Sequence, residues 1–405
     1  MDPLDVVSNI EKVLPFFQPV YSADTQKVAG FESVGRIHLE TFQSLEFFFK
    51  NDTVPEEFLL EVENELLKKS LQNLVDFGRD YFLFINRHPK ALLMDDPDNF
   101  ITLLQEYEDK GLKLSNIVLV LNHGLFHGSE KELKNLITYY QTYGIKIAID
   151  SISDRVINLS TLRYLSPDII KIDLKHVKNS IHTSSFQDIL QAIIYVASKM
   201  GASIYYDGIS DSHHLRQAWK NGGRFYQGAH LSIPDQEMKD SIHFSETLKN
   251  DIQHFIAAEK TKLESLSNVT YLLQQRVESV INKYQKYENF TDLLSKMTND
   301  LQSFCFRMYI CDGDGYQQTA NLFKLNNDSW IIQEEYVQKN WSWRPYFLET
   351  VLKMRVNEKG ILSDLYRDIE TGEKIRTFSY PMEKGYDLYI DLSYDFLFKH
   401  DELLF

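Results

Sequence analysis

Apolar residues recur in short, nearly uninterrupted runs along the first 240 residues, and longer amphipathic stretches separate these runs. The runs predicted to be strands are 16–20, 28–32, 82–85, 117–121, 145–149, 169–172 and 203–206. The stretches predicted to be helices are about 54–76, 97–110, 129–143, 155–164 and 183–200, and Thr53 is the expected N-cap of the first. Apolar strands that alternate with helices are typical of a parallel sheet covered by helices. Seven or eight strands in about 240 residues favour a closed (β/α)8 barrel of the TIM type.

The pattern changes between residues 241 and 287, which contain no strand signal and no proline. Apolar side chains recur there every three or four residues, at Leu263, Leu266, Val269, Leu273, Val277, Val280 and Tyr284. This spacing predicts one long amphipathic helix with a seam like that of a coiled coil. A long seam between two domains favours a partner helix and therefore a homodimer. The alternative is a helix that packs on its own barrel.

Strand-like runs return in the last part of the chain, at 304–310, 319–325, 330–333, 377–381 and 388–392. Between the first two, Asp312-Gly313-Asp314-Gly315 reads as a tight turn, since it lacks the remaining ligands of a calcium loop. The predicted organisation is a barrel in 1–240, a helical linker in 241–290 and an α+β domain in 291–405.

Composition narrows the class of protein. The 405 residues carry a net charge of −15, which argues against a nucleic-acid-binding or membrane-surface protein, because both prefer a basic face. No apolar run is long enough to cross a bilayer, and Met1-Asp2-Pro3 does not begin a signal peptide. The expected location is therefore the cytoplasm.

Polar residues follow the predicted strands at the point where each strand ends. They are Glu32, Asn86, Asn122, Asp150, Lys171, Asp173, Asp207 and Gln227. Because barrel sites lie at the C-terminal ends of the strands, these side chains are expected to meet. Oxygen ligands beside one lysine suit Mg²⁺ or Mn²⁺ and a phosphate ester, and Arg36 could hold a phosphate in a bidentate fork. The alternative is a rim of polar residues that only cap and solvate the barrel.

These residues and their order resemble the EAL-domain family over about residues 1–240. The matching positions are Gln18-Pro19, Glu32-Ser-Val-Gly-Arg36 for E-x-L-x-R, Asn86, Asp150, Lys171-Ile-Asp173 for K-I-D, and Gln227-Gly228 for Q-G-Y. The resemblance implies a barrel that binds cyclic di-GMP and, in active members, hydrolyses it to linear pGpG with two divalent cations.

The departures from the family pattern concern the metal ligands. Val120 stands where active members have the first glutamate of E-x-T-E, and Ser151 stands for the second aspartate of D-D-F-G. In A-E-G-V-E, one glutamate is shortened to Asp207 and the other is replaced by Ser210. Losing carboxylates should weaken the binding of the second cation. The expectation is a hydrolytically dead or very slow member that senses cyclic di-GMP. The alternatives are a weak metal-dependent phosphodiesterase and an interaction scaffold that binds no nucleotide.

The resemblance also assigns roles. Arg36, Asp173 and Gln227 are predicted to bind the nucleotide, and Lys171 is a remnant of the catalytic machinery. An incomplete Mg²⁺ or Mn²⁺ cage is predicted from Glu32, Asn86, Asp150 and Asp207. His123 and His127 are interpreted as ordinary rim histidines rather than metal ligands.

The C-terminal stretches 340–347 and 362–381 resemble PAS/Cache-like sensor domains. The resemblance implies a pocket with Trp343 and Tyr346 as walls and with Arg344 and Asp391 paired to the charged ends of a small molecule. Alternatively, the aromatic residues fill a core and Arg344 makes an internal salt bridge. The order of barrel, helix and C-terminal domain resembles the YkuI-type EAL proteins, which implies a dimer in cyclic di-GMP signalling with an unknown small-molecule or protein partner.

Overall fold

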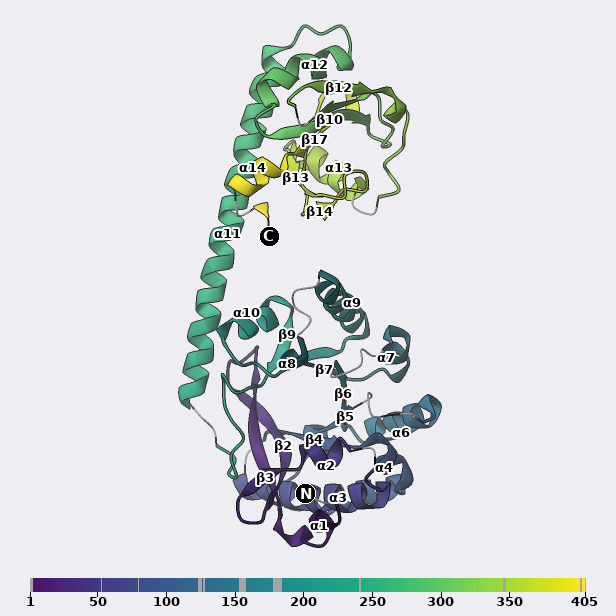
Figure 1. Cartoon of the computed structure of the whole chain (residues 1–405), viewed down its shortest axis with the longest axis vertical. Coiled ribbons are helices and arrows are strands. Elements are labelled where there is room, and N and C mark those ends of the chain that lie inside the picture. Colours follow the sequence, from purple (N-terminus) through teal and green to yellow (C-terminus); the bar gives the residue numbers. More distant parts are fainter. Residues whose placement is uncertain are drawn as a thin grey trace. The chain divides into compact units, whose positions relative to one another are not determined.

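The computed structural model describes residues 3–51, 53–78, 80–122, 126, 128–152, 158–177, 184–239, 242–325, 327–344, 347–400 and 403–404. The chain divides into two compact units, residues 1–255 and residues 256–405 (Figure 1). Each unit has an apolar core of its own.

The first unit is a closed barrel of eight strands, which confirms the predicted fold class. The strands are β1 (Val13–Ser22), β2 (Val28–His38), β4 (Phe82–Arg87), β5 (Ile117–Asn122), β6 (Lys146–Ile152), β7 (Ile169–Asp173), β8 (Ser203–Asp207) and β9 (Gly223–Tyr226). Neighbours from β2 to β9 run parallel, whereas β1 is antiparallel to both β2 and β9. The sheet is therefore not wholly parallel, because the short turn after β1 can join only antiparallel neighbours.

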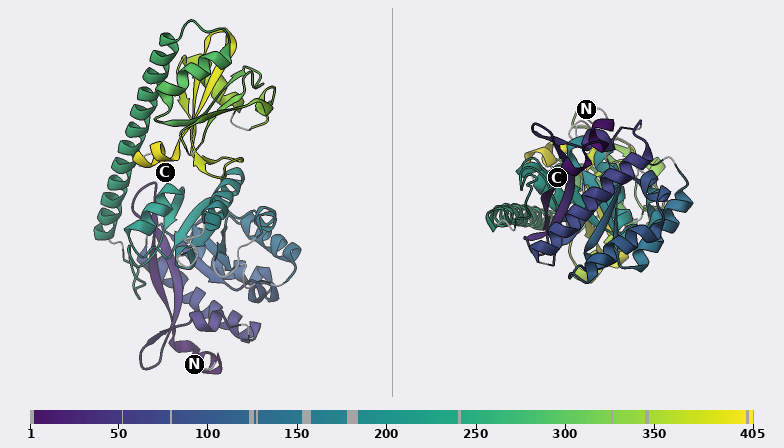
Figure 2. Two further views of the ribbon diagram at one scale, coloured as in Figure 1. Left: turned by 45° about the horizontal axis from the view of Figure 1, so that its top comes forward. Right: turned by 90° about the horizontal axis from the view of Figure 1, so that it is seen from below.

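Helices lie on the outside of the strand ring (Figures 1 and 2). They are α3 (Glu56–Phe77), α4 (Pro89–Met94), α5 (Pro97–Glu108), α6 (Glu130–Thr142), α7 (Leu159–Leu165), α8 (Leu174–Val177), α9 (Ser184–Met200) and α10 (Ser212–Lys220). Smaller elements are α1 (Pro3–Val7), η1 (Ile10–Lys12), β3 (Phe42–Ser44), α2 (Glu46–Phe49) and η2 (Leu114–Asn116). The prediction of Thr53 as N-cap is wrong, since Pro55 precedes α3 and no side chain caps it.

Alternation along the strands divides the barrel interior into two layers. The lower layer is an apolar plug of Val20, Phe84, Val118, Val120, Ala148, Ile169, Tyr205 and Phe225. Successive side chains of a strand point to opposite faces, so the residue two positions further on shares the interior face. Two positions after Phe84, Ala148 and Tyr205 in their strands stand Asn86, Asp150 and Asp207, which therefore share the interior face. The apolar plug is thus the floor of a polar mouth.

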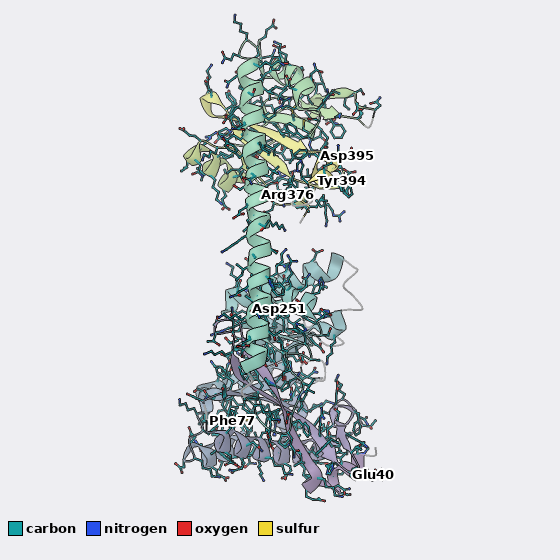
Figure 3. The ribbon with its side chains drawn as sticks, turned by 90° about the vertical axis from the view of Figure 1, so that its left-hand side faces the viewer. Glu40, Phe77, Asp251, Arg376, Tyr394 and Asp395 are labelled. Atoms are coloured by element: carbon teal, nitrogen blue, oxygen red, sulfur yellow. The ribbon has the colours of Figure 1, made fainter. Side chains whose placement is uncertain are left out.

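The second unit has an α+β fold built on an antiparallel sheet. Its strands are β12 (Trp330–Gln333), β11 (Asn321–Lys324), β10 (Cys305–Asp312), β17 (Tyr386–Leu392), β16 (Thr377–Pro381) and β13 (Ile361–Leu362), in that spatial order. A separate pair is formed by β14 (Tyr366–Arg367) and β15 (Lys374–Ile375). The other elements are α12 (Phe290–Leu301), η4 (Glu334–Tyr336), α13 (Phe347–Asn357), η5 (Glu383–Gly385) and α14 (Tyr394–Lys399). Arg376, labelled in Figure 3, ties down the C-terminal end by donating to the carbonyl oxygen of Leu403 at 2.7 Å.

The predicted long helix is α11 (Ile242–Lys283), and its predicted seam is covered within the chain from Leu266 onward, whereas Leu263 is 61% exposed. Near its start, Leu248, Ile252 and Phe255 join the core of the first unit. From Leu266 to Tyr284, the predicted seam residues pack in the core of the second unit, together with α12 and the sheet. From Leu266 onward the seam is thus covered by the helix α12 and the sheet of its own unit rather than by the core of the barrel, and the homodimer stays a prediction.

We expect Leu273→Ala to lower the free energy of unfolding of the second unit by about 2–5 kcal/mol, because it leaves a cavity in the core. The matched control is Leu272→Ala, since Leu272 is 61% exposed and Leu273 only 4%. The control should change stability by at most about 0.5 kcal/mol. Urea unfolding followed by tryptophan fluorescence measures both, and equal effects of the two substitutions would contradict the packing.

Among the buried acidic side chains of this unit, Asp387 keeps an oxygen atom without a hydrogen-bond partner in the described part of the chain. Asp387 on β17 is fully buried, and its nearest cation is Arg355, at 3.3 Å. The Oδ1 atom of Asp387 has no hydrogen-bond partner within the described part of the chain. Burial raises the pKa of Asp387 from 3.8 to about 6, although Arg355 acts to lower it. The fold therefore favours the protonated carboxyl group.

Because this pKa is higher in the folded state, the second unit should lose stability as pH rises from about 4 to 6. The loss attributable to Asp387 is at most about 3 kcal/mol, at about 1.4 kcal/mol per pKa unit. Asp387→Asn should flatten this pH dependence. Asp314→Asn, at an exposed turn position, should leave it unchanged. Urea unfolding at several pH values between 4 and 7 tests this, and an unaltered slope in Asp387→Asn would contradict it.

Candidate functional site at the barrel mouth

The mouth is organised around one buried carboxylate. Glu32 on β2 is only 4% exposed. The Lys171 ammonium on β7 lies 2.7 Å from each of its two oxygens. Asn86 Nδ2 donates to Oε1 at 2.8 Å, and the Tyr205 hydroxyl donates to Oε2 at 2.9 Å. Three strands thus supply donors to a single carboxylate, as expected for a negative charge removed from water.

Lys171 is the central positive charge of this cluster. Its Nζ also lies 3.1 Å from Asp207 Oδ2. Burial alone would lower the pKa of Lys171, but the nearby carboxylates of Asp207, Glu32 and Asp150 raise it above its ordinary value. Burial together with Glu32 raises the pKa of Tyr205 well above its ordinary value. The lysine is therefore a cation at neutral pH, and the tyrosine is a neutral donor.

Asp150 on β6 supplies an acceptor that the described residues leave unused. Its register partner on the next strand is Lys171, and its Oδ1 atom is buried without a hydrogen-bond partner among them. Burial raises the pKa of Asp150 to about 6, an effect that Lys171 opposes and that Asp207 and Glu32 reinforce. A buried, unpartnered carboxylate oxygen at the edge of a charged cluster is a ready ligand for a cation or a donor group.

Contacts between the end of β4 and the helix α3 hold Asn86 in position. The next residue, Arg87, turns outward and is buried against Glu63 of α3, with 3.3 Å between Nε and Oε2. The backbone N–H of His88 donates to Glu63 Oε1 at 2.6 Å. Burial raises the pKa of Glu63 to about 7, although Arg87 and the hydrogen bond from His88 act to lower it. This pair holds the end of β4, and with it Asn86, in place.

The donor atoms fit one divalent cation in type but not in their present arrangement. Glu32, Asn86 and Asp150 offer the oxygen ligands that Mg²⁺ and Mn²⁺ prefer. However, Lys171 contacts both oxygens of Glu32, and Val120 adds only methyl groups to the apolar plug. Across the described ranges, no group of three or more His, Cys, Asp or Glu residues is arranged to hold a metal ion.

The residues predicted to hold the nucleotide lie at different depths. Gln227 is buried and donates from Nε2 to the carbonyl oxygen of Gln18 at 3.4 Å. Asp173 Oδ1 accepts from the backbone N–H of Lys175 at 2.7 Å, so it closes the turn into α8. Arg36 lies four residues beyond Glu32 on the same face of β2. Its guanidinium carbon lies 4.3 Å from the centre of the Phe16 ring.

Sequence reasoning missed three contributors to the mouth: Tyr205, Phe16 and the role of Gly228. The period of two in β8 places Tyr205 on the same face as Asp207, and this signal could have identified it. Gly228 has a φ of +153°, and a Cβ there would lie 2.1 Å from the carbonyl oxygen of Ile209. Only glycine lets the segment after Gln227 pass this close to the backbone that follows β8. His123 and His127 lie outside the described residues.

The three predicted C-terminal pocket residues that the structure describes, Trp343, Arg344 and Asp391, differ widely in their burial and contacts. Asp391 is fully buried, with Arg307 Nε at 2.5 Å and the Thr377 hydroxyl at 2.5 Å. This placement argues against Asp391 as a ligand contact, because its carboxylate is already paired inside the sheet. Trp343 is 65% exposed, and the Arg344 guanidinium lies over the Trp341 ring at 4.6 Å. Tyr346 lies outside the described residues.

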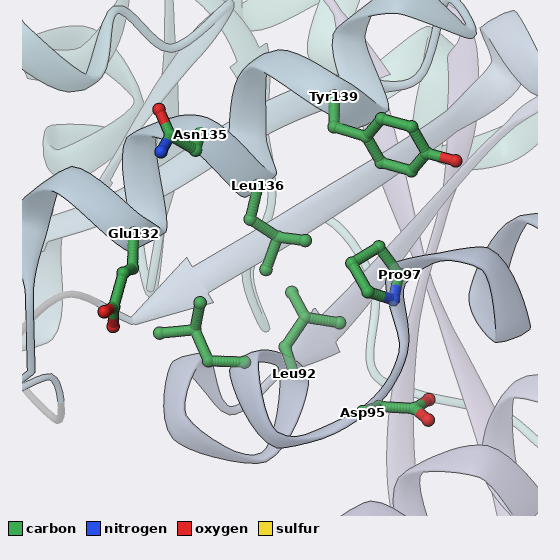
Figure 4. Close-up of a pocket in the computed structure, with 8 residues that line it drawn as sticks. Leu92, Asp95, Pro97, Glu132, Asn135, Leu136 and Tyr139 are labelled. Atoms are coloured by element: carbon green, nitrogen blue, oxygen red, sulfur yellow. The ribbon is translucent and has the colours of Figure 1, made fainter.

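A second hollow, of about 320 Å³, lies on the outside of the barrel between α4, the start of α5 and α6 (Figure 4). Leu92, Pro97 and Leu136 line it, with Asp95 and Glu132 beside them. None of the mouth residues contributes to it, so it is separate from the candidate site.

No helix within the described ranges is long and apolar enough to span a membrane.

Comparison with known proteins places this site in a family. Residues 7–234 match the EAL domain, and residues 238–404 match a domain described as an EAL-domain associated signalling protein domain. The Bacillus subtilis EAL-domain containing protein YkuI is 41% identical over 407 aligned residues, which cover 100% of both chains. The crystal structure of that protein, in complex with c-di-GMP and calcium, matches all of this chain with a TM-score of 0.93.

More distant structures share the barrel alone. An EAL protein of Vibrio cholerae O395, crystallised in a c-di-GMP-bound form, is 19% identical. It covers 57% of this chain and 97% of its own, with a TM-score of 0.51, which shows a common fold. The barrel, the cluster around Glu32 and the match over residues 7–234 agree, and the chain belongs to the EAL-domain family.

Proposed function

We propose that this protein is a receptor for cyclic di-GMP whose barrel binds the nucleotide and hydrolyses it very slowly or not at all. The observation that carries the proposal is the mouth itself, where Glu32, Asn86, Asp150 and Lys171 meet in an EAL barrel. The similarity to YkuI, crystallised with c-di-GMP and calcium, supports the choice of ligand.

The charges at the mouth disfavour efficient hydrolysis. A two-cation site needs enough carboxylates to offset four positive charges and to lower the pKa of the attacking water. Val120 is buried in the apolar plug and can offer no ligand, and Ser151 replaces an aspartate of the family motif. Asp207 is already engaged with Lys171. A water molecule near Lys171 would lack the second cation that makes it a strong nucleophile.

Binding requires fewer groups than catalysis. Arg36 carries a positive charge on the β1–β2 ribbon, and its guanidinium lies over the ring of Phe16. We infer that Arg36 binds a phosphate of the nucleotide in a bidentate fork. Gln227 and Asp173, at the ends of β9 and β7, offer polar atoms for the guanine bases.

A second candidate function is a weak phosphodiesterase that uses a single cation. The specific observation that favours it is the oxygen set of Glu32, Asn86 and Asp150, in which Asp150 Oδ1 is buried and makes no hydrogen bond to any described residue. One Mg²⁺ or Mn²⁺ bound there could polarise a phosphate oxygen. An interaction scaffold with neither activity is the third possibility, and measured binding of cyclic di-GMP to this protein would exclude it.

We also propose a role for each of the three parts of the chain. We propose that residues 1–240 form the nucleotide-binding part, 241–290 the linker and 291–405 a sensor of PAS/Cache-like type for a small molecule or a protein. Assembly as a homodimer also remains a proposal. The seam of α11 gives it no support from Leu266 onward, because those side chains are covered within the chain.

Arg36→Ala should weaken binding of cyclic di-GMP about 10- to 100-fold, because a charge-assisted hydrogen bond to an ionised group is worth about 1.5–3 kcal/mol. Isothermal titration calorimetry with and without Mg²⁺ measures the loss. The matched control is Arg224→Ala, an exposed arginine at the start of β9 and so at the opposite end of the barrel. Equal affinity in Arg36→Ala and the unaltered protein would refute this role for Arg36, and no binding by the unaltered protein would refute the receptor.

The unaltered protein should convert cyclic di-GMP to pGpG at no more than trace rates, even with millimolar Mn²⁺. The physical reason is the shortage of carboxylates for a second cation. Product formation is followed by chromatography, beside a reference such as the cyclic di-GMP phosphodiesterase TpdA of Vibrio parahaemolyticus. Turnover comparable to that reference would overturn the receptor in favour of the enzyme.

A further inference from the structure

We propose that the ammonium group of Lys171 is the resident cation of the barrel mouth, and that a divalent metal binds Glu32 only by displacing it. This inference rests on the proposed function only in taking the mouth as the ligand site. It assigns to Lys171 a second role, as a competitor of the metal, besides its position in the family motif.

The contacts of Lys171 are those expected of a cation held in a cage of oxygens. Nζ is 2.7 Å from both oxygens of Glu32 and 3.1 Å from Asp207 Oδ2. The side chain is almost fully buried, so water does not share this coordination to any large extent. A metal that binds Glu32 through one or both oxygens would have to occupy the space and the lone pairs that the ammonium now uses.

Charge balance makes the competition strong. Three carboxylates surround the site, from Glu32, Asp150 and Asp207, and all three act on Lys171. While Lys171 is present, an incoming divalent cation meets both the repulsion of a buried ammonium and a partly neutralised cage. Removing the ammonium leaves the carboxylates without their counter-charge. At such short distances and in a poorly solvated site, this change should alter metal affinity by at least about tenfold.

The simpler reading treats Lys171 as part of an ion pair that stabilises the barrel and has no bearing on metal binding. The two readings predict opposite outcomes for a neutral substitution. If Lys171 only stabilises the barrel, its removal destabilises the fold and leaves metal affinity unchanged or weaker. If it is the resident cation, its removal creates a metal site that is tighter than the original.

The test is Lys171→Met, titrated with Mn²⁺ alone in calorimetry, with no nucleotide present. The matched control is Lys146→Met, which removes the same charge from the start of β6, four residues before Asp150 and at the far end of that strand. We expect Mn²⁺ to bind Lys171→Met at least about tenfold more tightly than the unaltered protein, and Lys146→Met to match the unaltered protein. Equal or weaker binding by Lys171→Met would overturn the proposal, and so would equal tightening by both variants.

A second variant keeps the test decisive if Lys171→Met does not fold. Lys171→Gln retains a donor for Glu32 but removes the charge, and its melting temperature is measured with and without Mn²⁺. The proposal expects a larger rise with Mn²⁺ in this variant than in the unaltered protein, and an equal or smaller rise would overturn it. Cyclic di-GMP is titrated separately, into the unaltered protein in EDTA and then with Mn²⁺ restored. Absence of nucleotide binding in both would refute the receptor without affecting the Mn²⁺ result.

Discussion

A buried carboxylate needs a positive partner, and the mouth of this barrel is arranged around that requirement. Glu32 lies almost without solvent at the end of β2. Lys171, Asn86 and Tyr205 reach it from three other strands, so the strand ends are held together by one set of polar contacts. Removing Lys171 or Glu32 would leave the other charge buried without a counter-charge. Such a change is strongly destabilising. The position of each strand end is therefore linked to the others.

The alternation of the strands explains why much of this could be predicted from the sequence. In a barrel, interior residues recur every second position, and the last interior residue of each strand lies at the mouth. This rule identified Glu32, Asn86, Asp150, Lys171 and Asp207 from their place after apolar runs. It says nothing about which side chains bind one another. The contact between Lys171 and Glu32 joins residues 139 positions apart, and only the closed ring of strands brings them together.

The failures have a common physical cause, since a local pattern shows which face of an element is apolar but not what covers it. The seam of α11 was correctly placed, yet from Leu266 onward it is covered by α12 and the sheet of the second unit. Asp391 was expected to pair with a charged end of a ligand, yet Arg307 of the neighbouring strand pairs with it inside the sheet. In both cases the covering residues come from distant parts of the chain. Sequence periodicity cannot contain that information.

Charge balance connects the missing carboxylates with the position of Lys171. With acidic residues at positions 120 and 151, a single lysine would leave the mouth strongly negative, and stable folding would favour bound cations. With Val120 and Ser151 instead, the remaining carboxylates of Glu32, Asp150 and Asp207 face one ammonium. Burial raises the pKa of Asp150 to about 6. Its protonation as pH falls therefore reduces the excess negative charge at the mouth further. The same substitutions that remove metal ligands thus also reduce the negative charge at the mouth, where Lys171 is the counter-charge of Glu32.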